Sequence, residues 1–173
     1  MKYSLLFTPL LLSLSFNAFA AEAHTLKVKE EVVINAPASK VWEKANNFGD
    51  LGAWHPAVKT TEILSGTNNK KGAIRLLTLQ DGGTIKEQLL GYHPTFKSYK
   101  YKIIEGVLPV SNYVSTVSVK SQGENKTLVV WQGKFKRKDT SANPAAGQGD
   151  DDAVKAITGV YRGGLDNLKK ISE

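Results

Sequence analysis

A few polar residues in this sequence could anchor a ligand or take part in acid–base chemistry. Arg75 and Glu87 lie on two neighbouring predicted strands joined by the turn at residues 81–83, and in the simplest register they face each other. If both point inward, the pair is a polar anchor for a ligand carbonyl or hydroxyl, because a buried charge needs a partner. If both point outward, it is a salt bridge on a solvated face. Both interpretations remain open.

Aromatic side chains supply the other candidates, because aromatic walls suit flat or apolar ligands. Each of them also fits ordinary core packing. His55, which precedes Pro56, is either a general acid or base or a residue that shapes its loop. The aromatic candidates are Trp54, Tyr101, Tyr113, Trp131 and Tyr161.

Other kinds of chemistry are disfavoured by the composition. The chain has no cysteine, which excludes thiol catalysis, cysteine-bound zinc and disulfides. His24, His55 and His93 are isolated and show no metal-ligand spacing. There is no G-x-S-x-G motif and no phosphate-binding loop. We therefore expect no metal and no cofactor, and the sequence gives no positive evidence of catalysis.

The elements that must position these residues begin with a strand. Residues 26–34 alternate apolar and polar side chains, which is typical of a half-buried strand. Pro37 ends this strand and opens a short helix at 38–45, and a second short turn follows at 48–53. Turn-forming residues then separate six further predicted strands, at residues 58–64, 73–79, 84–92, 96–105, 112–120 and 127–137.

The C-terminal part is predicted to be one long amphipathic helix. Residues 140–149 read as a loop, and Asp150, Asp151 and Asp152 supply an N-cap and favourable negative charge at a helix start. Gly159, Gly163 and Gly164 lie inside the helix and indicate either close approach of another group or a kink. The apolar stripe consists of Val154, Ile157, Tyr161, Leu165, Leu168 and Ile171.

This order of elements predicts an α+β domain. A curved antiparallel sheet of six to seven strands would wrap around the one long C-terminal helix, in the order β-α-α-β6-α. A sheet of that length tends to leave a cavity at its centre, and apolar cavities with a few polar groups are typical ligand sites.

The first twenty residues are predicted to be a cleaved signal peptide. A short positive start precedes an apolar stretch, and Ala18-Phe19-Ala20 is a small-x-small cleavage site. We therefore expect a periplasmic or secreted protein whose residues 21–173 form one domain, with no transmembrane segment. The formal net charge of +7 allows an acidic protein partner, whereas export and the even spread of basic residues argue against nucleic acid.

Several segments resemble the SRPBCC superfamily of START-like helix-grip domains, which includes polyketide cyclases and lipid-transfer proteins. Residues 29–42 (KEEVVINAPASKVW) show its strand, Ala-Pro and x-x-x-Val-Trp pattern, and residues 48–56, 72–75, 85–89 and 99–101 also match. The resemblance covers nearly all of residues 21–173 and implies the helix-grip fold. With its signal peptide, the chain is also similar to the small periplasmic MxaD-like accessory proteins of methanol oxidation.

A second resemblance concerns the cavity. Arg75, Glu87 and the stretch Asn112-Tyr113-Val114-Ser115 resemble the plant abscisic-acid receptors. That resemblance implies that Glu87, Tyr113 and Ser115 point into the cavity and that the turns at 81–83 and 107–110 flank its mouth. The receptors' ligand-carboxylate lysine is absent, with Trp54 near its place, which argues against an anionic hormone-like ligand inside.

From these features we expect an exported protein that binds a small apolar or amphipathic molecule, lipid- or polyketide-like, between the sheet and the C-terminal helix. One alternative is an accessory protein that docks on a periplasmic oxidoreductase through the basic run at residues 134–138. Another is a polyketide cyclase or dehydratase with Glu87 or His55 as its base. The predicted ligand-contacting residues are Trp54, His55, Arg75, Glu87, Tyr101, Tyr113, Ser115, Trp131 and Tyr161.

Overall fold

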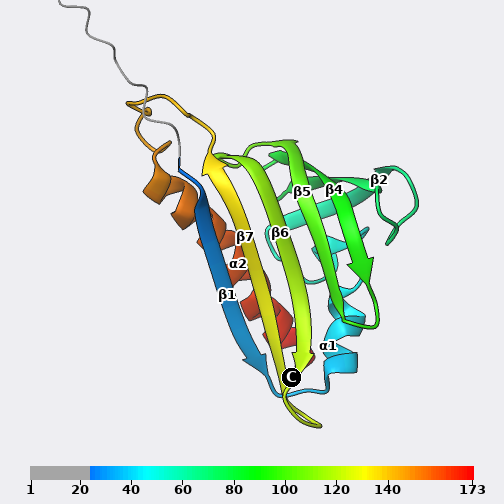
Figure 1. Ribbon diagram of the computed structural model, residues 1–173. Helices are drawn as coiled ribbons and strands as arrows, with labels where there is room; N and C mark the ends of the chain where they lie inside the picture. The colour runs from blue at the N-terminus through cyan, green and yellow to red at the C-terminus, as the bar shows by residue number, and fades with distance from the viewer. Residues whose placement is uncertain (1–23) are drawn as a thin grey trace, which may run out of the picture.

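Residues 24–173 are described by a computed structural model, in which a curved sheet lies against a long helix (Figure 1). The predicted signal peptide at residues 1–20 lies outside the described residues. Within them, no helix is both long and apolar enough to cross a bilayer.

The order of elements confirms the sequence-based prediction, with shifts of one or two residues at several strand ends. β5 begins at Ser98 rather than at Phe96, and β6 begins at Val110 rather than at Asn112. The elements are β1 (Leu26–Ile34), α1 (Ala38–Ala45), the 3-10 helix η1 (Leu51–Ala53), β2 (Val58–Ser65), β3 (Ile74–Leu79), β4 (Thr84–His93), β5 (Ser98–Gly106), β6 (Val110–Ser121), β7 (Thr127–Arg137) and α2 (Asp150–Ser172).

The seven strands form one antiparallel sheet in the order β1-β7-β6-β5-β4-β3-β2. Alternate residues of most strands are buried on the inner side of the sheet, where α2 lies along β1 and β7 (Figure 1). α1 packs beside α2. The apolar core contributed by the sheet includes Val28, Ile34, Leu77, Ile85, Leu89, Tyr99, Val117, Val129 and Phe135.

Helix α2 presents most of the predicted apolar stripe to this core. Ile157, Tyr161, Leu165 and Leu168 are fully buried, whereas Ile171 is 37% exposed at the edge of the stripe. The predicted N-cap is wrong by one residue, because Gly149 occupies that position. Its backbone N–H donates to the Asp152 carboxylate at 3.0 Å, and all three aspartates lie in the first turn, where the helix dipole favours them.

The sheet divides near the turn that joins β5 to β6. The two strands pair only as far as Lys102 and Val114. Beyond this point β5 stays paired with β4 and β6 stays paired with β7. The divergence coincides with an irregularity in β6 between Ser111 and Val114, where Asn112 has a φ of 51°. Asparagine tolerates this left-handed conformation better than most residues, so the local sequence fits the divergence.

Candidate functional site

A network of buried hydroxyl and indole groups lies between the sheet and α2. The Tyr161 hydroxyl on α2 is 2.7 Å from that of Tyr113 and 2.9 Å from the Ser115 Oγ. The Trp131 indole donates to the Tyr101 hydroxyl and to the Ser115 Oγ, both at 3.0 Å. The 3.3 Å contact between the Tyr101 and Tyr113 hydroxyls completes the network. Five of the predicted site residues therefore form one connected polar cluster.

Trp131 is also the centre of an aromatic cluster. Its ring stacks on Tyr161 with the centroids 4.6 Å apart, and the rings of Trp54 and His55 lie 5.3 and 5.9 Å away. The indole N–H of Trp54 is buried and has no hydrogen-bond partner among the described residues. An unpaired buried donor is costly, so this group is available to a ligand acceptor if the packing around it opens.

The Arg75–Glu87 pair points inward, which decides between the two sequence-based interpretations. The two residues are directly paired across β3 and β4, and they are 1% and 4% exposed. The Arg75 Nε and Nη2 lie 2.7 and 2.6 Å from the Glu87 Oε2. The Nη1 donates to the Phe48 carbonyl at 2.6 Å, and the guanidinium lies over the Phe48 ring at 4.1 Å. Phe48, which the sequence analysis did not select, therefore helps to hold the pair.

Burial changes the acid–base properties of these groups. It raises the pKa of Glu87, while the charge of Arg75 opposes the increase. Burial also raises the pKa of Tyr161 to about 12 and those of Tyr101 and Tyr113 well above 10. The hydroxyls consequently stay protonated at neutral pH, and the cluster around them is polar but uncharged.

His55 is fixed by contacts to two backbone segments. Its Nε2 lies 3.0 Å from the Val160 carbonyl of α2, and its Nδ1 accepts a hydrogen bond from the Ala57 N–H at 3.3 Å. A neutral ring with its proton on Nε2 satisfies both contacts. Burial lowers the pKa of His55 below its ordinary value of 6.5, against the effect of the Val160 hydrogen bond. At neutral pH the ring is therefore uncharged.

A small cavity lies in the interior between the sheet and α2. Its volume is about 60 Å³, far below the roughly 300–1,000 Å³ of typical ligand pockets. Of the predicted residues, His55, Glu87, Tyr101, Tyr113 and Trp131 line it, while Trp54, Arg75, Ser115 and Tyr161 lie behind this lining. Leu108, in the turn expected at the mouth, also lines the cavity, and further lining residues that are not among the predicted ligand contacts include Leu51, Ile103 and Val160.

A larger groove opens on the surface where β5 and β6 diverge. Its volume is about 770 Å³. Ile103, Leu108 and Tyr113 line both this groove and the small cavity, so their side chains form the partition between the two spaces. This placement agrees with the expectation that the turn at 107–110 lies at the mouth of the cavity.

The two turns expected to flank the mouth touch each other. A β-carbon built on Gly83 would lie 3.0 Å from the Val107 Cγ2, and the Val107 N–H donates to the Thr84 carbonyl at 3.1 Å. Contact between the turns covers this side of the interior. The two turns are therefore closed over this side of the interior.

Two of the five residues in the basic run at 134–138 are buried. Phe135 is in the core, and Arg137 is buried, with its Nη1 2.8 Å from Asp150. Lys138 donates to the Gly106 carbonyl at 2.9 Å. Alternation along the strand turns Phe135 and Arg137 inward and leaves Lys134 and Lys136 together on the outer face, so docking of an acidic partner through this run stays a prediction.

Replacement of Gly164 tests the close packing of α2 on the aromatic cluster. An added β-carbon would lie 2.7 Å from the His55 Cδ2 and 2.8 Å from the Trp131 Cζ3. We expect Gly164→Ala to lower the free energy of unfolding by about 1–3 kcal/mol through overpacking. Gly159→Ala is the matched control, because nothing lies within 4 Å of its added carbon. It should be stabilising by up to about 1 kcal/mol. Denaturant titrations that show both changes stabilising would contradict the packing described.

A second prediction concerns pH. Because His55 has a lowered pKa in the folded protein, the unfolded chain binds its proton first. The free energy of unfolding should thus fall as the pH decreases below about 6.5, by at most about 1.4 kcal/mol per pH unit for one proton. Urea titrations between pH 7.5 and 5 should show a smaller fall for His55→Gln. The free energy of unfolding of the exposed His93→Gln control should vary with pH as it does in the wild type. The same pH dependence in all three proteins would refute the role of His55.

Comparisons with known proteins agree with this architecture. The chain is 28% identical over 115 residues to MLP-like protein 423 of Arabidopsis thaliana, an alignment that covers 62% of this chain and 74% of that protein. The structure of XoxI from Bacillus cereus superposes with a TM-score of 0.73 at 27% identity, covering 84% of this chain and 94% of XoxI. The Zhui aromatase/cyclase of a Streptomyces species shares the fold at 18% identity, with a TM-score of 0.68 and coverage of 86% and 94%.

One protein family matches almost the whole described region. Its description is polyketide cyclase/dehydrase and lipid transport, and the match extends over residues 25–173. The helix-grip architecture and the SRPBCC resemblance of the sequence agree with this match. The chain therefore belongs to the polyketide cyclase/dehydrase and lipid transport family.

Proposed function

We propose that this protein binds a small apolar or amphipathic molecule between the sheet and α2 and that the ligand enters through the groove between β5 and β6. The observation that carries the proposal is the shared partition: Ile103, Leu108 and Tyr113 line both the groove and the cavity. Movement of a few side chains would join the two spaces. Residues 1–20 retain their interpretation as an export signal, so we place this activity in the periplasm.

Binding requires the interior to expand. The cavity of about 60 Å³ has room for only a few water molecules. Leu108 lies in the short turn between β5 and β6, which makes it the partition residue best placed to move. Displacement of this turn from Gly83 would open the groove toward the cavity. Burial of the ligand then contributes about 25 cal/mol of favourable binding free energy per Å² of apolar surface removed from water.

The polar groups of the interior would orient the ligand. The hydroxyls of Tyr101, Tyr113 and Ser115 already have partners, so a ligand carbonyl or hydroxyl must replace one of these hydrogen bonds. Such an exchange favours a ligand with few polar atoms. The same residues were selected from the sequence as ligand contacts, and for each of them ligand contact stays a prediction.

Binding is better supported than catalysis. Glu87, one candidate base, is held by Arg75, and the other, His55, has both ring nitrogens engaged by backbone groups. A cyclase reaction would require one of them to exchange its partner for substrate. An accessory role toward an oxidoreductase, with docking through the basic run at 134–138, also stays a prediction.

Covalent closure of the two turns tests the proposed route. Gly83→Cys combined with Val107→Cys introduces the only two cysteines, at positions already in contact. We expect native mass spectrometry to show 1-dodecanol bound to the wild type and to the reduced variant but lost from the oxidised variant. Dithiothreitol should restore uptake, which makes each sample its own control. Equal uptake in both redox states would refute this route, and no uptake of dodecanol or of a panel of lipids, sterols and aromatics by any form would refute the proposed function.

A further inference from the structure

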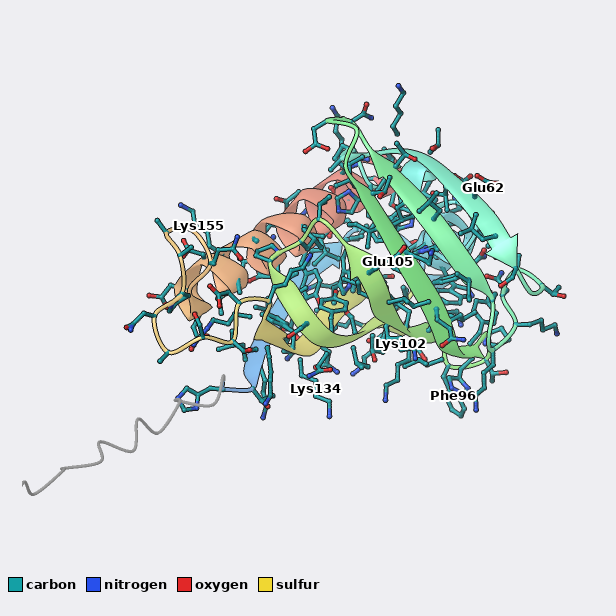
Figure 2. All side chains as sticks on the ribbon, turned by 90° about the horizontal axis from the view of Figure 1, so that it is seen from above. Glu62, Phe96, Lys102, Glu105, Lys134 and Lys155 are labelled. Atoms are coloured by element: carbon teal, nitrogen blue, oxygen red, sulfur yellow. The ribbon has the colours of Figure 1, made fainter. Side chains whose placement is uncertain are left out.

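Lysine side chains lie across the outer face of the sheet, next to the end of the groove where β5 and β6 begin to diverge. Strand register places Lys102 of β5, Val114 of β6, Lys134 of β7 and Lys27 of β1 in one lateral row. Neighbouring strands lie about 4.8 Å apart, so Lys102 and Lys134 start roughly 10 Å apart on either side of Val114. We call Lys102 and Lys134 the mouth lysines. Figure 2 shows both on the side of the sheet away from α2.

The next row repeats this arrangement. Lys100 and Lys29 lie at its ends, with Thr116 and Gln132 between them. The two rows surround a hollow of about 400 Å³ on the outer face. Val114 lines both this hollow and the groove, so the basic face and the groove are continuous.

Unlike Lys29, which pairs with Glu31, the mouth lysines have no acidic partner within the described residues. Within residues 24–173 neither mouth lysine forms an ion pair, and Lys134 lies directly opposite Lys27, an arrangement that destabilises a sheet. The nearby acids have other partners: Glu31 contacts Lys29 at 2.6 Å, and Glu105, which also lines the groove, contacts Lys86 at 2.7 Å. An external anion would relieve the repulsion between the lysines.

The interior offers no comparable site. Arg75, next to the cavity-lining Glu87, is already paired with that residue, and an additional anion there would be buried without a partner. The groove itself is lined by Ile103, Leu108 and Val110, and Ile104 and Val107 are 45% and 55% exposed near it. Glu105, Ser111, Asn112 and Lys138 also line the groove. Polarity therefore changes from cationic at the outer face to mixed polar and apolar in the groove.

On the basis of the proposed function, we infer that the ligand is an anionic amphiphile. Its head group, a carboxylate, sulfate or phosphate, contacts the mouth lysines, while its apolar tail lies in the groove and reaches the interior between β5 and β6. The lack of an unpaired cation beside the cavity thus does not exclude an acidic ligand. It excludes only an orientation with the acidic group inside.

Binding of three twelve-carbon amphiphiles tests this inference. Dodecanoate, 1-dodecanol and dodecylammonium have the same tail and differ in head-group charge. Titrations of the wild type at low salt, followed by tryptophan fluorescence, should give the highest affinity for dodecanoate and the lowest for dodecylammonium. The double variant Lys102→Glu, Lys134→Glu should weaken dodecanoate binding about tenfold or more and leave dodecanol within about twofold, because only the charged head depends on these lysines.

Lys155→Glu, combined with Lys170→Glu, is the control for net charge, because these exposed residues lie on α2 (Figure 2 labels Lys155). It should leave the ratio of dodecanoate to dodecanol affinity within about twofold of the wild-type value. Equal wild-type affinities for dodecanoate and dodecanol would overturn the inference alone, whereas failure of all three to bind would overturn the proposed function as well.

Flotation with vesicles separates a free amphiphile from a membrane surface. Phosphatidylglycerol vesicles should not carry the wild type more than phosphatidylcholine vesicles do under conditions in which monomeric dodecanoate binds. Co-flotation that requires the mouth lysines, without uptake of monomeric dodecanoate, would overturn the inference in favour of a membrane-docking surface.

Discussion

The polar groups on the inner face of the sheet must find their partners within the protein, because the interior has almost no room for water. The structure meets this requirement by bringing the Tyr161 hydroxyl of α2 close to Ser115 and Tyr113. That approach depends on Gly133, where a β-carbon would overlap the Tyr161 hydroxyl. Gly164 has the corresponding role on the helix, where it admits the rings of His55 and Trp131. Two glycines thus set the distance between the layers.

The same requirement shapes the proposed site. Because the buried hydroxyls already satisfy one another, the closed interior is stable without a ligand, and binding must exchange existing hydrogen bonds and displace existing contacts. The weakest part of the enclosure is the place where β5 and β6 cease to pair. Ile103, Leu108 and Tyr113 close the opening there by side-chain contact rather than by a continuous ladder of backbone hydrogen bonds. We therefore regard this region as the part of the fold that changes when a ligand enters.

Local patterns in the sequence were sufficient to predict the order of elements and the helix-grip fold. Facing positions on adjacent strands also predicted the pairing of Arg75 with Glu87, but not its direction, since alternation alone does not say which face is inside. The small size of the cavity follows from how several aromatic rings pack together, which residue spacing does not specify. The row of Lys27, Lys134 and Lys102 depends on register across four strands, so these residues look unrelated along the chain. Asn112 is a local signal of the divergence between β5 and β6, but an asparagine at the start of an alternating segment is equally compatible with a regular strand.

Isotope-filtered NOE spectra of the ¹³C-labelled protein with unlabelled 1-dodecanol would show directly whether a ligand reaches the interior between β5 and β6. We expect contacts from the alkyl chain to Ile103, Leu108 and Tyr113, the residues that line both groove and cavity. Contacts confined to other surfaces, with no NOE to these three side chains, would contradict this route.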